Sequence, residues 1–108
     1  MRKLKFIVKG QLIEQDPSCD FSGLVPGTEG YLQAEFSFSK DWDNVTKVVS
    51  FRSAMGMEYE PQVLDESNSC VIPVEALKKR VFKIRIIGKS LDIPKMQTNT
   101  VAVSQNGG

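Results

Sequence analysis

The chain has 108 residues, of which 41% are hydrophobic and 25% charged, with 14 basic and 13 acidic side chains and no histidine. This size predicts one globular domain that can bury a hydrophobic core. The lack of histidine excludes Ser–His and Cys–His nucleophiles, and no apolar run is long enough to span a membrane.

Alternating apolar and polar residues indicate that β-strands dominate the fold. The pattern is clearest in residues 31–38 and 81–87, where apolar residues recur at every second position. Pro61 cannot donate a backbone hydrogen bond, so the strand around it is expected at a sheet edge. The expected strands, in chain order, cover residues 3–8, 11–15, 31–38, 46–52, 58–64, 69–72, 81–87 and 98–104.

Three of the segments between these strands have a distinctive composition. Residues 16–30 contain five of the thirteen glycines and prolines, which predicts a long exposed loop of the kind that often forms a contact surface. Residues 73–79 predict one short helix, because Pro73 suits the first helical position and the basic residues come last. Pro94 is expected to interrupt the chain before the last strand.

Seven to eight short strands with regularly spaced turns predict an all-β fold, either a single small Ig-like β-sandwich or a partly open barrel. We expect residues 1–104 to form this domain and residues 105–108 to be a disordered tail. Trp42 is expected to cover the open end of the core. The expected core side chains are Phe36, Phe38, Trp42, Phe51, Phe82, Ile84 and Ile86.

Few residues have the chemistry of a catalytic or metal site. The only two cysteines, Cys19 and Cys70, cannot make a four-ligand zinc site by themselves, and no glycine-rich phosphate loop is present. We therefore expect no enzymatic activity, no metal and no cofactor. Lysines interrupt the first nine residues, which argues against a signal peptide and for synthesis in the cytoplasm. There the thiols are most simply reduced, although a Cys19–Cys70 disulfide stays open.

The net charge of +1 hides an uneven distribution. Residues 1–9 hold four bases and no acid, residues 10–73 three bases and eleven acids, and residues 74–108 seven bases and two acids. A surface with two signs suits contacts with another protein or copy, whereas the small net charge argues against nucleic acid. Which charged face forms the interface stays open. The candidate protein-binding residues are Lys78, Lys79, Arg80, Lys83, Arg85, Lys89, Asp41, Asp43, Asp65 and Glu66.

Several segments together resemble small β-rich proteins of phages and prophages of Gram-positive bacteria. These segments are the aromatic alternation of 31–43 ending in Trp42-Asp43, the strand 46–52, the Leu-Asp…Cys-x-Ile-Pro-x-Glu-x-Leu pattern of 64–77, the strand 81–88 ending in glycine, and Thr-Asn-x-Val at 98–101. The resemblance covers about residues 31–104, and the basic–apolar strand of residues 1–9 also fits.

Such proteins are usually encoded among tail or baseplate genes, so the resemblance implies a non-enzymatic structural or adaptor protein. Its partners would be copies of itself or other phage components. It would be made in the bacterial host cytoplasm and end in the virion. The alternative is a phage-encoded inhibitor of a bacterial defence system, whose acidic residues mimic the phosphates of nucleic acid for a host nuclease or signalling enzyme.

Overall fold

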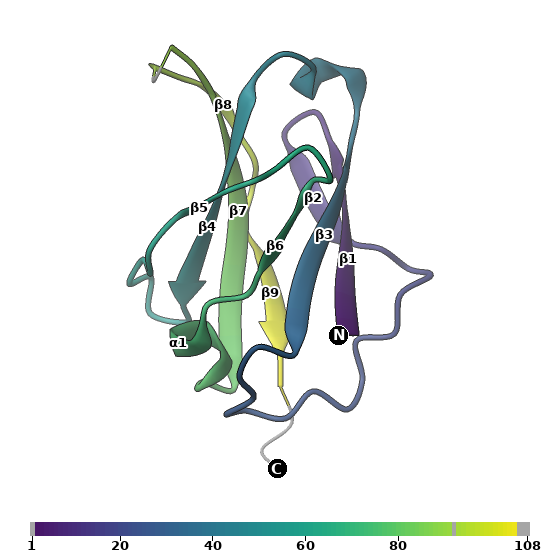
Figure 1. Cartoon of the computed structure of the whole chain (residues 1–108), viewed down its shortest axis with the longest axis vertical. Helices are drawn as coiled ribbons and strands as arrows, with labels where there is room; N and C mark the ends of the chain where they lie inside the picture. Colours follow the sequence, from purple (N-terminus) through teal and green to yellow (C-terminus); the bar gives the residue numbers. More distant parts are fainter. Residues whose placement is uncertain (1, 92, 106–108) are drawn as a thin grey trace.

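Two β-sheets pack face to face in the computed structural model, which describes residues 2–91 and 93–105 (Figure 1). Sheet A has the order β2-β1-β3-β6 and consists of β1 (Arg2–Lys9), β2 (Leu12–Gln15), β3 (Leu32–Phe38) and β6 (Ser69–Val71). Sheet B has the order β5-β4-β7-β8, with β9 also on β7, and consists of β4 (Thr46–Ser53), β5 (Gln62–Val63), β7 (Val81–Ser90), β8 (Ile93–Gln97) and β9 (Val101–Ser104). Two helical turns, η1 (Lys40–Trp42) and α1 (Val74–Leu77), complete the described elements.

The predicted all-β sandwich is confirmed, and the sheets do not close into a barrel. The described residues form nine strands rather than seven or eight, because β8 lies where Pro94 was expected to interrupt the chain. Pro94 is tolerated there because β8 is an edge strand, and Pro94 pairs with Lys89 where a bulge shifts the register after Gly88.

Most predicted strands appear at their expected places, but one strand and the predicted helix are shorter than expected. The strand expected at 58–64 is reduced to β5 and one isolated bridge between Arg52 and Glu58. The helix expected at 73–79 is the single turn α1. Among the described residues, neither helical turn has the length and hydropathy needed to cross a membrane.

Sheet A contains a parallel pair at its centre. β1 and β3 run in the same direction, with Phe6 opposite Phe36. Their rings stack with centroids 5.3 Å apart, on the face that also carries Leu4 and Val8. Because β1 and β3 are parallel, a long connection joins them. It consists of β2, which pairs with β1, and of residues 16–30, which lead from β2 to β3.

The core lies between the sheets and contains the predicted side chains. Phe51, Phe82, Ile84 and Ile86 from sheet B face Phe36 and its neighbours from sheet A, and Phe38 is half-buried at the margin. Trp42 is fully buried at one end, where its Nε1 donates to the Gly10 carbonyl at 2.8 Å. The prediction that Trp42 covers the end of the core is confirmed.

The two long sides of the sandwich are closed differently. On one side the Asn99 side chain joins the sheets: its Oδ1 accepts from Ile13 N at 2.7 Å and its Nδ2 donates to Ile13 O. On the other side the chain crosses from the edge strand β5 to the edge strand β6 and returns to sheet B through α1 (Figure 1). This second side therefore carries both crossing segments.

The predicted disordered tail is wrong at its first residue. Gln105 is buried, and its Nε2 donates to the carbonyls of Leu77 at 3.2 Å and Lys79 at 2.6 Å. A buried amide gains these bonds because the turn after α1 leaves backbone carbonyls without strand partners. Residues 106–108 of the predicted tail lie outside the described residues.

Candidate protein-contact site

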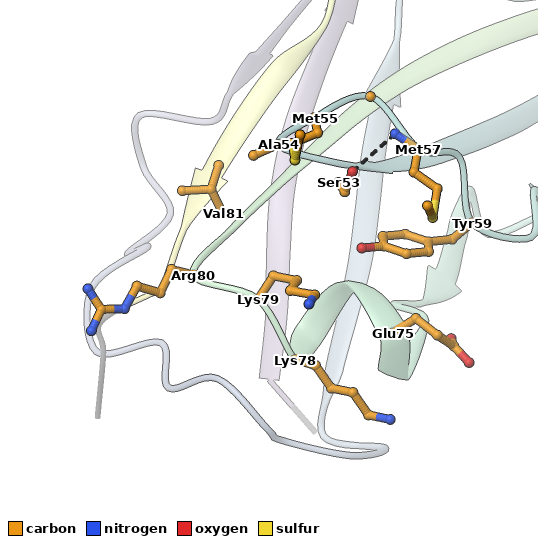
Figure 2. A pocket seen from close by; sticks show the side chains of 11 residues that line it. Ser53, Ala54, Met55, Met57, Tyr59, Glu75, Lys78, Lys79, Arg80 and Val81 are labelled. Carbon is orange, nitrogen blue, oxygen red and sulfur yellow. Dashed lines mark hydrogen bonds between the residues drawn. The ribbon is translucent and has the colours of Figure 1, made fainter.

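A groove of about 910 Å³ lies at the end of sheet B where β4 ends and β7 begins (Figure 2). One wall is the loop that follows β4, and the other is formed by α1 and the turn into β7. The lining residues are Ser53, Ala54, Met55, Gly56, Met57, Tyr59, Glu75, Lys78, Lys79, Arg80 and Val81.

The first wall is a tight turn that exposes two methionines. Met57 O accepts from Ser53 N at 2.9 Å, and Met57 N donates to Ser53 Oγ at 3.0 Å, which closes the loop. Gly56 has φ of 93°, a conformation that favours glycine. With the backbone fixed in this way, Met55 is 97% exposed and Met57 70% exposed. Flexible, polarisable methionines of this kind suit an adaptable binding surface.

The second wall presents basic side chains. Ala76 and Leu77 of α1 are buried against the core, whereas the three residues that follow α1 are exposed on the surface. Gln105 fixes the turn through its bonds to Leu77 and Lys79. Lys78, Lys79 and Arg80 are therefore held on the exposed rim of the groove, with Glu75 as the one acidic lining residue.

The structure divides the predicted basic residues into two groups. Lys78, Lys79 and Arg80 line the groove, whereas Lys83, Arg85 and Lys89 follow β7 on the outer face of sheet B, because Phe82, Ile84 and Ile86 face the core. On that face, Arg85 donates to Gln97 Oε1 at 3.2 Å. Arg85 and Lys89 also line a hollow of about 540 Å³ beside β8.

The predicted acidic residues lie away from the groove, also in two groups. Asp41 belongs to η1 and accepts from Ser39 Oγ at 3.1 Å, and Asp43 follows directly after η1. Asp65 and Glu66 form the turn between β5 and β6, beside a hollow of about 550 Å³ that Val45 and Lys47 also line. These charged residues therefore do not converge on a single site.

The turn between β5 and β6 is rigid because of Asp65. Ser67 donates to Asp65 Oδ1 twice, from its hydroxyl at 2.6 Å and from its N–H at 2.9 Å. The hydroxyl hydrogen bond in particular holds the pKa of the Asp65 carboxyl below its usual range. Asp65 is thus held in place by Ser67, and the exposed Glu66 lies beside it.

The described residues include no group of three or more His, Cys, Asp or Glu side chains that could hold a metal ion. Cys19 and Cys70 are both free thiols in this structure. Burial raises the pKa of the Cys70 thiol to about 12, and the nearby Asp65 carboxylate adds to this effect. A thiol with so high a pKa is almost entirely protonated at neutral pH and is a poor nucleophile.

Two features of the site differ from the expectations based on sequence. Residues 16–30 were expected to be a contact loop, but they also contribute to the core. Leu24 is buried, and the Phe21 ring packs edge-on against the Phe6 ring with the ring centroids 5.4 Å apart. Met55 and Met57 were not expected to form a surface. The available signal was two methionines on either side of a glycine, in the segment between the strands expected at 46–52 and 58–64.

No protein-family model matches the chain, and no curated protein is significantly similar to it in sequence.

Proposed function

We propose that the chain is a non-enzymatic structural or adaptor domain of a phage tail or baseplate, and that it acts through contacts with protein. The resemblance of residues 31–104 to small phage proteins motivates the phage assignment. Synthesis in the host cytoplasm and incorporation into the virion belong to the same proposal.

The groove is the observation that supports a protein-binding role. Met55 and Met57 expose apolar surface that costs free energy in water, and such exposed surface commonly marks an interaction site. An apolar centre with a charged rim, here Lys78, Lys79 and Arg80, is the usual composition of a protein–protein interface.

The rigid acidic turn favours the second candidate function, inhibition of a bacterial defence system. Asp65 is fixed by two hydrogen bonds from Ser67, and Glu66 stands exposed beside it. Asp41 and Asp43 form a second acidic group at η1, and in this proposal the carboxylates of each group take the place of phosphates in the basic channel of a host nuclease or signalling enzyme.

Purified phage particles distinguish the two functions. A structural domain is expected to co-purify with tail proteins at a fixed ratio, measured by quantitative mass spectrometry. Reversal of Lys78, Lys79 and Arg80 to glutamate should lower its incorporation, whereas the same reversal of the exposed Lys5, Lys9 and Lys40 should not. Finding the chain only in the lysate, bound one-to-one to a host nuclease or signalling enzyme, would overturn the structural proposal in favour of inhibition.

A further inference from the structure

We infer that two copies of this chain associate about a two-fold axis, each seating the last residue of its β5 and the start of its β5–β6 turn (together residues 63–66) in the groove of the other. The inference rests on the proposed function, because it names the partner that the groove contacts. It accounts for both the basic rim and the acidic turn.

The charges of the two surfaces are complementary. Three bases, Lys78, Lys79 and Arg80, and one acid, Glu75, line the groove. The turn carries Asp65 and Glu66, and residues 62–69 include no base. Since Ser67 already fixes the Asp65 carboxylate, the turn loses little conformational freedom when a partner binds it.

Each of the two surfaces also has an apolar part beside its charged part. Val63 lies on β5 opposite Val48, two residues before Asp65, and is 67% exposed. In the groove, Met55 and Met57 lie across from the basic rim (Figure 2). A turn with an apolar residue beside its carboxylates can therefore place Val63 on the methionines and its acids on the lysines.

One copy cannot fill its own groove. Val63 pairs with Val48, whereas the groove begins at Ser53 on the same strand, and five residues of β-strand span roughly 17 Å. Both surfaces lie toward the side of the sandwich that carries the two crossing segments. The basic groove and the acidic turn together form a surface with bases at one end and acids at the other. When a second copy is rotated by 180°, its acids meet the bases of the first copy and its bases meet the acids, as in the commonest symmetric dimers.

Charge reversal on each surface tests this contact. The groove variant is Lys78→Glu/Lys79→Glu, and the turn variant is Asp65→Asn/Glu66→Lys, in which asparagine keeps the hydrogen-bonding geometry of the turn. Each variant alone juxtaposes like charges and should be monomeric. An equimolar mixture should form a heterodimer, because both of its contacts then join opposite charges. A chain with all four changes should again form a homodimer.

Mass in solution is measured by light scattering and native mass spectrometry at protein concentrations up to about 1 mM, where even weak contacts are populated. The wild-type chain should be a dimer that added salt weakens, and reversal of Lys5, Lys9 and Lys40 should leave it dimeric. A monomeric wild type, or a dimer that survives both variants, would overturn the inference. In that case a groove variant with reduced incorporation into particles would point to an acidic segment of another phage protein, and the proposed function would stand.

Discussion

Trp42 packs directly against Gly88: a methyl group on Gly88 would lie 2.9 Å from Cζ3 of the indole and 2.9 Å from Cγ of Met96. The glycine is therefore required because the core is closed at this point by a rigid aromatic side chain. Since Trp42 also donates to the Gly10 carbonyl, it cannot move away without losing that hydrogen bond.

We expect Gly88→Ala to destabilise the fold by about 2 kcal/mol, the cost of overpacking a rigid core site. The free energy of unfolding is measured by denaturant titration followed by tryptophan fluorescence. Ser90→Ala on the same strand serves as the control and should change stability little. Unchanged stability in Gly88→Ala would contradict the close packing of Trp42.

Gln105 provides a second test of the fold, at the opposite end of the sandwich. Gln105→Ala removes both hydrogen bonds to the turn after α1 and leaves the carbonyls of Leu77 and Lys79 without this donor. We expect a loss of about 2 kcal/mol in the free energy of unfolding. The neighbouring Ser104→Ala, at an exposed position of β9, should be close to neutral. A neutral Gln105→Ala would support the disordered tail expected from sequence.

Leu91 should be a position where substitution stabilises the protein. It has φ of 53°, a left-handed conformation that disfavours leucine, and its side chain is 93% exposed and contributes little to packing. Leu91→Asn should raise the free energy of unfolding by about 1 kcal/mol, because asparagine tolerates this conformation. The control Leu12→Asn replaces an exposed leucine in extended backbone, so the reason for the gain at Leu91 does not apply there. A loss of stability in Leu91→Asn would show that the leucine makes contacts beyond those described.

The raised pKa of Cys70 should make the free energy of unfolding fall at alkaline pH. Burial raises its pKa from the ordinary value of 9.0 to about 12, so the folded chain holds a proton that the unfolded chain releases. This contribution is fully present below pH 9 and is lost as pH rises from 9 toward 12, by about 1 kcal/mol per pH unit at first.

The measurement is the free energy of unfolding at several pH values between 8 and 11 for the wild type and Cys70→Ala. The difference between the two should shrink as pH rises, since only the wild type has this thiol. A constant difference would mean that Cys70 titrates in the same way in the folded and unfolded chain.

The strands with local alternation were predictable from sequence, and the pairings between them were not. The alternation of Phe82, Ile84 and Ile86 shows which face of β7 is buried, and this requires no knowledge of the neighbouring strands. The parallel neighbours β1 and β3 cannot be inferred in this way, because both show the same alternation whichever strand lies beside them. β8 was not predicted because proline is rare inside strands. β8 accommodates Pro94 because it is an edge strand whose pairing with β7 contains a bulge.

The candidate site, too, could be predicted from sequence only in part. Lys78, Lys79 and Arg80 were recognised as candidate contact residues from their charge. Met55 and Met57 were not, since exposure of an apolar residue depends on how the chain turns after β4. Lys83 and Arg85 were predicted as candidate contact residues along with these lysines, but the alternation of β7 places that pair on the outer face of sheet B.

The bond between Asn99 and Ile13 connects positions 86 residues apart and closes one side of the sandwich. This side therefore cannot form during translation until residue 99 has left the ribosome. Pairings of such high contact order fold in milliseconds to seconds rather than microseconds. During that interval the edges of β2 and β9 are open to other strands, so the newly made protein depends on reaching its closed state before it meets another unfinished copy.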